Sequence, residues 1–265
     1  MTHDVRVSSL TFDRYCHEIG YQTDLLAGHV KGADGTAPIA SCPGWDLDRL
    51  LRHVGGDHRW ADEVVRTRAD RPVPDEGVND PAVYADIDGA ALGPWLSDGA
   101  AALAASLRAA GPRVQVWTPA EDRFTTAFWA RRMAHETVVH RADAALATGA
   151  EFRLDDDLAA DGIEEWLEFS TVSEAYEPRP DTPELLGAGR SLRFHAIGAG
   201  QWFVDLDGDR PTWRIGYGDA AVSLRGSVTD LLLLLYRRPA PTVEVRGETD
   251  LLDLWLTRTG FWLEV

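Results

Sequence analysis

Apolar side chains recur three and four positions apart over much of the first 150 residues, which is the spacing of one face of an α-helix. The spacing predicts helices over residues 10–27, 47–64, 94–111 and 125–149. Asp46 is placed to cap the second of these helices. Pro94 and Gly111 mark the start and the end of the third, and Gly149 is placed to cap the fourth. Four consecutive helices predict a helical bundle.

The pattern changes after Ala150. One more helix, over residues 158–169, is followed by a Pro-rich stretch and by segments rich in β-branched and aromatic residues. These segments predict strands over residues 191–197, 201–206, 212–217 and 220–225, with a hairpin turn at DGDR between two of them, in an antiparallel sheet. Two helices, over 227–238 and 250–259, close the chain. The predicted fold class is α followed by α+β, with domains 1–150 and 151–265.

Two further segments lie between the predicted helices. Residues 69–81 are rich in Pro, Asp and Gly, so they are expected to form a long surface connection. The short segment VQVW, residues 114–117, predicts a brief strand.

Composition restricts the possible partners and compartments. The chain has 265 residues, 45% hydrophobic and 26% charged, as in an ordinary globular protein. A net charge of -17 argues against nucleic acid as a partner, because phosphate backbones are bound mainly by clustered Lys and Arg. Cys16 and Cys42 are its two cysteines, and no signal peptide or long apolar stretch is evident, so a cytoplasmic protein without a membrane segment is expected.

Glu136 and His140 are four residues apart in the predicted helix 125–149. Residues at this spacing lie one above the other on the same helix face, so a carboxylate and an imidazole point to the same place. Taking about 100° per residue, Trp129, Met133 and Asp143 lie within about 60° of Glu136. The pair therefore belongs to a largely apolar stripe and is expected to point inward.

The second predicted helix repeats this feature, because His53 and Asp57 fall within its apolar stripe. A buried carboxylate or imidazole without a partner costs several kcal/mol, and binding a cation removes that cost. Three nitrogen and oxygen ligands with one open position are typical of catalytic zinc. The sequence thus predicts that His53, Glu136 and His140 bind Zn²⁺ or another divalent metal ion. Asp143 and Asp57 are predicted to orient these ligands without binding the metal themselves.

Simpler interpretations apply to several residues near this set. A helical Glu-x-x-x-His pair is commonly only a surface or capping contact. His135 points about 100° away from Glu136, so His135 and His58 are expected to be surface or hydrogen-bonded histidines. Cys42, in a Pro-Gly-Trp turn, is expected to be a packing residue rather than a nucleophile. No Gly-x-Ser-x-Gly motif of a serine hydrolase occurs.

The segments CPGWDLDRLLRHVGGDHRW and HETVVHRADAALATG together resemble the mycothiol-dependent maleylpyruvate isomerase family, a branch of the DinB-like metalloenzymes of actinobacteria. The resemblance covers the predicted bundle, and the rest of the chain resembles the smaller, sterol-carrier-like α+β domain of that family. It implies zinc ligands at the positions of His53, Glu136 and His140.

The resemblance also implies mycothiol, a low-molecular-weight thiol, as cosubstrate. In the isomerase reaction it implies, the thiolate adds to an activated double bond, the new single bond rotates, and elimination returns the trans isomer. Transfer of the thiol to another small electrophile is an alternative use of the same site. The family draws a substrate-binding arginine from its C-terminal domain, and Arg238 and Arg246 are the candidates here.

Two other functions remain open at this stage. A zinc hydrolase would hold water in the open metal position and would need no thiol. A non-catalytic module would keep the metal site and bind an apolar ligand in the C-terminal domain. The partners expected for the enzyme are a small electrophile and a thiol, and the protein is expected to be a monomer or a homodimer.

Overall fold

The computed structural model describes residues 10–75, 80–120, 123–180 and 182–263. These residues form two compact units, one from Leu10 to Arg153 and one that begins at Leu154. None of the described helices is both long and apolar enough to cross a membrane.

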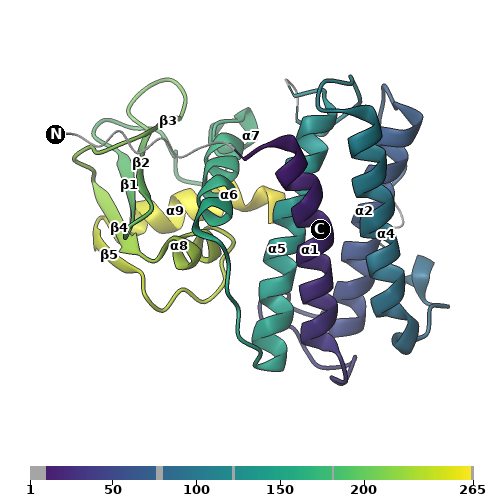
Figure 1. Cartoon of the computed structure of the whole chain (residues 1–265). Helices are drawn as coiled ribbons and strands as arrows, with labels where there is room; N and C mark the ends of the chain where they lie inside the picture. The colour runs from purple at the N-terminus through teal and green to yellow at the C-terminus, as the bar shows by residue number, and fades with distance from the viewer. Residues whose placement is uncertain (1–9, 76–79, 121–122, 181, 264–265) are drawn as a thin grey trace. The chain divides into compact units, whose positions relative to one another are not determined.

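The first unit is a four-helix bundle made of α1 (Phe12–Val30), α2 (Leu47–Thr67), α4 (Gly89–Ala110) and α5 (Thr126–Thr148). Figure 1 shows these helices side by side with nearly parallel axes. Both α1 and α2 pack against α4 and α5. A short 3-10 helix, η1 (Pro81–Tyr84), lies before α4. The sequence-predicted bundle is therefore confirmed.

Capping accounts for the start of α2, and glycine ends α4 and α5. The Asp46 side chain accepts a hydrogen bond from the Arg49 amide at 2.8 Å, as predicted. Gly111 and Gly149 follow α4 and α5 with φ of 76° and 70°, a conformation that costs glycine little.

The predicted start of α4 at Pro94 is wrong, because Pro94 lies inside the helix. Asp88 is the cap, and its side chain accepts a hydrogen bond from the Ala90 amide at 3.0 Å. A proline normally disfavours helix at the residue before it through a clash with that residue's Cβ. Here that residue is Gly93, which has no Cβ, so the helix continues through the proline.

The predicted strand at residues 114–117 is reduced to one isolated bridge between Gln115 and Thr125. Of the connection predicted over residues 69–81, positions 76–79 lie outside the described residues. The described part before this gap contains no helix or strand beyond the end of α2.

Gly55 lets α2 and α4 approach each other closely. A Cβ on Gly55 would lie 2.1 Å from Cζ3 of Trp95 on α4. We therefore expect Gly55→Ala to lower the free energy of unfolding by about 1–3 kcal/mol, the usual cost of overpacking, although alanine favours helix by about 1 kcal/mol. Gly20→Ala, inside α1, is the matched control, because its Cβ would meet no atom within 4 Å. Chemical denaturation measures the free energy of unfolding of both variants. A Gly55→Ala protein as stable as the wild type would contradict the close approach of α2 and α4 at Gly55.

The second unit contains α6 (Asp156–Phe169), α7 (Ser173–Tyr176), α8 (Val228–Leu235), α9 (Thr249–Thr259) and the 3-10 helix η2 (Gly260–Leu263). Its strands are β1 (Ser191–Ala196), β2 (Gly200–Asp205), β3 (Thr212–Ile215), β4 (Val222–Gly226) and β5 (Glu244–Gly247), in the order β3-β2-β1-β4-β5. The predicted fold class, α followed by α+β, is confirmed.

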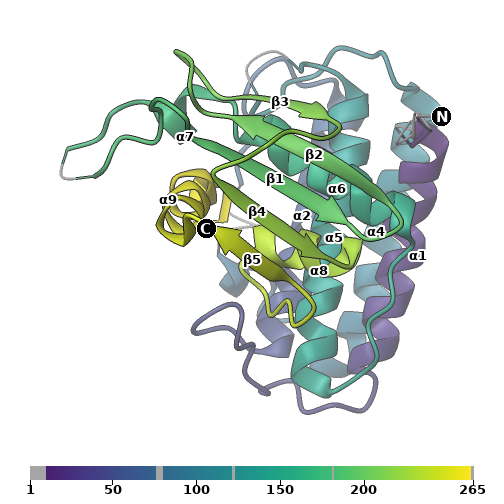
Figure 2. The same cartoon turned by 90° about the vertical axis from the view of Figure 1, so that its left-hand side faces the viewer.

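The prediction of a purely antiparallel sheet is wrong, because β4 pairs with β1 in parallel. After β1 the chain forms β2 and β3 on one side of that strand. It then crosses to the other side of β1, where β4 runs in the same direction as β1. β5, which the pattern did not reveal, pairs with β4. In Figure 2 the sheet lies in front, with α6 and α8 behind it.

Buried and more accessible side chains alternate along the central strands, so the two faces of the sheet differ. Leu192, Phe194, Trp202, Val204, Val222 and Leu224 are fully buried. Phe194 contacts Trp255 of α9, and the Trp202 indole donates a hydrogen bond to Glu164 of α6 at 3.1 Å. The side chains that alternate with these buried residues therefore lie on the opposite face of the sheet.

Candidate metal centre

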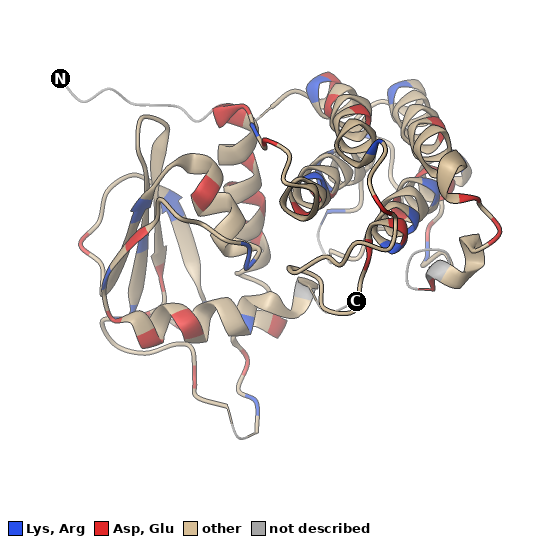
Figure 3. Ribbon diagram, turned by 90° about the horizontal axis from the view of Figure 1, so that it is seen from below, with Lys and Arg blue, Asp and Glu red and all other residues tan. Residues whose placement is uncertain are grey.

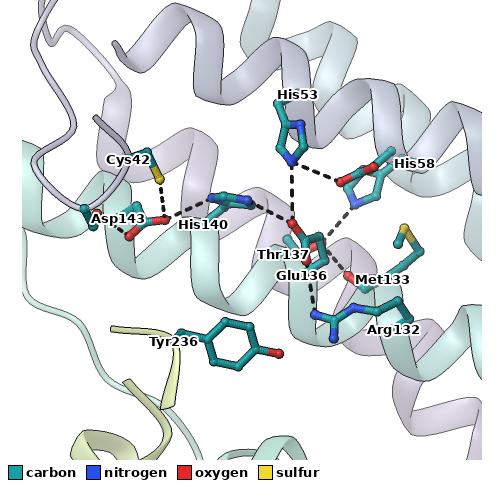
Figure 4. A network of polar contacts seen from close by, with 12 residues as sticks. Cys42, His53, His58, Arg132, Met133, Glu136, Thr137, His140, Asp143 and Tyr236 are labelled. Atoms are coloured by element: carbon teal, nitrogen blue, oxygen red, sulfur yellow. Dashed lines mark hydrogen bonds and ion pairs between the residues drawn. The ribbon is translucent and has the colours of Figure 1, made fainter. Parts of the chain in front are cut away.

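The three predicted ligands lie together in the bundle. One possible ligand atom from each of His53, Glu136 and His140 lies within 4.8 Å of the other two. Nε2 of His140 is 2.9 Å from Oε1 of Glu136, and Nε2 of His53 is 3.5 Å from the same oxygen. Both imidazoles point toward this carboxylate (Figure 4). Two nitrogen donors and one oxygen donor thus converge on one position.

Local helix geometry explains this convergence. Glu136 and His140 are one turn apart on α5, and His53 faces them from α2, which packs against α5. The His53 and His140 side chains are buried, whereas that of Glu136 is 23% exposed. The carboxylate is therefore the most accessible of the three groups.

The charge states of Glu136 and His140 depend on each other. Burial alone would raise the pKa of Glu136, but the charge on His140 and the hydrogen bonds from His140 and His53 hold that pKa well below its usual range. Burial alone would lower the pKa of His140, but Glu136 and the hydrogen bonds to Asp143, Cys42 and Glu136 raise it well above its usual range. In the absence of a bound cation, a proton on His140 therefore balances the negative charge of the Glu136 carboxylate.

Asp143 holds the other side of the His140 ring. Its Oδ2 lies 3.0 Å from Nδ1 of His140, and the Asp143 side chain is fully buried. Ser41 donates a hydrogen bond to Asp143 at 2.5 Å, and the Cys42 sulfur lies 3.6 Å from it. An Nδ1–H that donates to Asp143 makes Nε2 of His140 the ring nitrogen that can bind a metal ion or, when protonated, donate a hydrogen bond to Glu136.

Asp57 lies next to His53, with 3.4 Å between its Oδ2 and Nε2 of His53. It therefore approaches the nitrogen that also faces Glu136, rather than the opposite side of the ring. Burial raises the pKa of Asp57 to about 6, against the opposing effect of His53. Its role as a supporting carboxylate stays a prediction.

Two residues at the site were missed by the sequence interpretation. The Trp45 ring stacks on His140 with 5.9 Å between ring centroids and meets His53 edge-on at 4.8 Å. Arg132 donates a hydrogen bond to Oε2 of Glu136 at 3.1 Å. Arg132 could have been found, because it precedes Glu136 by one helical turn. Trp45 carries no such signal, because its contacts depend on the fold of the loop before α2.

The expected surface position of His58 and His135 is wrong, because both side chains are buried. α5 is buried on nearly all sides, so pointing away from Glu136 does not mean pointing to solvent. His58 Nε2 lies 2.9 Å from the Thr137 hydroxyl, in agreement with the hydrogen-bonded alternative, and His135 meets the edge of Tyr15. Neither belongs to the group of three donors.

His58 gives a testable pH dependence of stability. Burial, followed by the charge on Arg59, lowers the pKa of His58 to about 3. Below about pH 6.5 the unfolded chain binds a proton at this residue and the folded chain does not, so the folded state loses stability as the pH falls toward 3, by up to about 1.4 kcal/mol per pH unit. We expect His58→Gln to make the stability of chelator-treated protein less dependent on pH between 6.5 and 4, as measured by chemical denaturation. An unchanged slope would contradict a buried neutral His58.

The structure also shows where the other predicted residues, Cys42, Arg238 and Arg246, lie. Cys42 is half-buried and packs against the apolar core of the bundle, as predicted, besides contacting Asp143. Arg238 and Arg246 belong to the second unit. Arg238 is nearly buried and donates a hydrogen bond to the Tyr236 carbonyl at 2.6 Å, whereas Arg246 is exposed and pairs with Glu244 at 3.3 Å. Their role in substrate binding stays a prediction.

Fold and site define a class of protein in which a four-helix bundle that carries two histidines and a glutamate is followed by a smaller α+β unit. Residues 16–145 match the family model of the mycothiol maleylpyruvate isomerase N-terminal domain, and residues 157–254 match that of the MDMPI C-terminal domain. The chain belongs to the mycothiol maleylpyruvate isomerase family. No curated protein matches it significantly by sequence.

Two solved structures have the same fold. The crystal structure of the mycothiol-dependent maleylpyruvate isomerase superposes with a TM-score of 0.63 at 14% sequence identity, over 90% of this chain and 95% of that one. The crystal structure of a histidine-to-alanine mutant of that enzyme superposes with a TM-score of 0.63 at 13% sequence identity, with the same coverage of both chains. At these identities the likeness establishes the fold alone.

Proposed function

We propose that this chain is a zinc-dependent enzyme that uses mycothiol to isomerise, or to transfer the thiol to, a small electrophile of the maleylpyruvate type. The observation that carries this proposal is the convergence of His53, Glu136 and His140 within 4.8 Å. Family membership supports the thiol and the substrate class.

The donor set fits a zinc ion. Histidine nitrogen and carboxylate oxygen both suit zinc, and three protein ligands are the number typical of a catalytic site. When bound, such an ion supplies a Lewis acid that lowers the pKa of a coordinated thiol. A thiolate then exists at neutral pH without any cysteine of the protein taking part.

The protein's own residues orient and shield this site. Asp143 fixes the tautomer and the orientation of His140 through its 3.0 Å contact with Nδ1. Trp45 packs against both imidazoles and limits the rotation of their rings. Arg132 donates a hydrogen bond to the second carboxylate oxygen of Glu136, which leaves Oε1, on the side of the two histidines, free to bind the metal ion.

In the isomerisation, the sulfur of the thiolate forms a bond to one carbon of the activated double bond, whose electron pair moves into the conjugated carbonyl group. Rotation about the resulting single bond follows. Breaking the carbon–sulfur bond restores the double bond in the trans form and releases the thiol unchanged. An anionic substrate needs a cationic partner, and Arg238 and Arg246 stay our proposed candidates.

Turnover of maleylpyruvate with and without mycothiol tests this function. We expect the zinc-loaded protein to convert the cis to the trans isomer, with a rate that rises from near zero with mycothiol concentration. Thiol consumption together with an adduct would instead identify the transferase activity within the same proposal. Hydrolysis without thiol would favour the zinc hydrolase and overturn the use of thiol. No reaction with any thiol or electrophile would favour the binding module.

A further inference from the structure

The sheet face opposite the helices carries a cluster of cationic side chains. In the strand register, Arg193 of β1 lies opposite Ser223 of β4, which lies opposite Arg246 of β5. In the next row on this face, His195 lies opposite Arg225. Adjacent strands are about 4.8 Å apart, so these long side chains reach a common space above Ser223. Figure 3 shows blue positions gathered on the strands.

This face is hollowed above β1, β4 and β5. The hollow has a volume of about 310 Å³ and its polar lining consists of Arg193, His195, Ser223, Arg225, Glu244 and Arg246. Three guanidinium groups and one carboxylate give this lining a net formal charge of +2, although the whole chain carries -17. The hollow is therefore an isolated cationic site on an acidic protein.

Its positive charge is only partly neutralised by the protein. Arg246 pairs with Glu244 at 3.3 Å, but neither Arg193 nor Arg225 forms an ion pair with a carboxylate among the residues that the structure describes. Nε of Arg193 is buried, and no described residue accepts a hydrogen bond from it. Burial and the charges of Arg225 and Arg193 lower the pKa of His195, as expected for an imidazole in a cationic environment. Arg193 is half-buried with its guanidinium 4.8 Å from the centroid of the Tyr217 ring, whereas Arg225 and Arg246 are exposed, so all three remain charged and able to donate hydrogen bonds to an anion.

We propose that this hollow binds a small phosphate ester. A phosphomonoester carries a charge of about -1.5 to -2 near neutral pH, which matches the net charge of the lining. Its three terminal oxygens accept hydrogen bonds from several directions, as Arg193, Arg225 and the Ser223 hydroxyl offer, whereas one bidentate arginine already satisfies a planar carboxylate. The volume leaves space for a small organic group besides the phosphate. The site lies wholly within the second unit, uses none of the proposed metal ligands, and shares only Arg246 with the residues proposed for the metal-dependent reaction.

Isothermal titration of the full chain with glycerol 3-phosphate tests this site. We expect saturable binding of one ester per chain, weakened about tenfold or more by either Arg193→Gln or Arg225→Gln, as the loss of a charge-assisted hydrogen bond predicts. Arg210→Gln is the matched control, because Arg210 is exposed in the turn between β2 and β3 and its loss changes the net charge equally. The thermal unfolding midpoints of the variants confirm that each is folded.

Three results would overturn the proposal: no saturable binding by the wild type, an equal loss of affinity in Arg210→Gln, or tighter binding of malonate than of the phosphate ester. His53→Ala is expected to bind the ester as tightly as the wild type. Failure of this site and failure of the proposed metal chemistry are therefore separate results.

Discussion

Glu136→Ala is expected to abolish metal retention and thiol-dependent turnover while most of the bundle stays folded. Glu136 is the group toward which both imidazoles point, at 2.9 and 3.5 Å. Without it, His53 and His140 are two neutral donors, too few for a tightly held catalytic ion. We expect metal affinity to fall by more than about a hundredfold, beyond the 10- to 100-fold typical of losing a residue that only orients a ligand. Equilibrium dialysis against a metal buffer measures the loss.

His135→Ala is the matched control for this prediction. His135 precedes Glu136 on the same helix and is also buried, but it lies outside the group of three donors. It should retain metal and activity, at some cost in stability for the cavity left behind. A His135→Ala protein without metal, beside a Glu136→Ala protein that keeps it, would show that the wrong face of α5 had been assigned to the site.

Asp143→Asn should weaken metal binding by about 10- to 100-fold without removing a ligand. The carboxylate lies 3.0 Å from Nδ1 of His140 and fixes which ring nitrogen carries the proton. An amide of the same size can present its NH₂ group to Nδ1, which favours the tautomer whose Nε2 is protonated and cannot ligate. The readouts are metal affinity by competition with a chromophoric chelator and the far-ultraviolet circular dichroism of the fold.

Ser41→Ala gives a graded comparison, since it removes one hydrogen bond to Asp143 and leaves the carboxylate in place. Its effect on metal affinity should be smaller than that of Asp143→Asn. Equal affinity in Asp143→Asn and wild type would mean that His140 is oriented by its other neighbours alone.

Much of the bundle was predictable because its signals are local. Helix periodicity, the Asp46 cap and the glycines after α4 and α5 each act within a few residues of the chain. The spacing of Glu136 and His140 likewise fixes their shared direction before any tertiary contact forms. Their meeting with His53 required only that α2 pack against α5, as a four-helix bundle allows.

The errors arose where tertiary contacts decide the outcome. Alternation along β1 and β4 identifies strands but contains nothing about the direction of their pairing. The burial of His58 and His135 depends on how many neighbours α5 has, which the sequence of α5 alone does not specify. The contact of Ser41 with Asp143 joins residues about a hundred positions apart in the chain, so no local pattern predicts it.

Elemental analysis of the purified wild-type chain and of His53→Ala tests the central claim most directly. Metal binding by His53, Glu136 and His140 predicts about one zinc ion per wild-type chain and almost none in the variant. Addition of mycothiol to the wild type should then bring sulfur to about 2.3 Å from the metal in X-ray absorption spectra. Metal absent from both proteins, or present equally in both, would contradict the assignment of this centre.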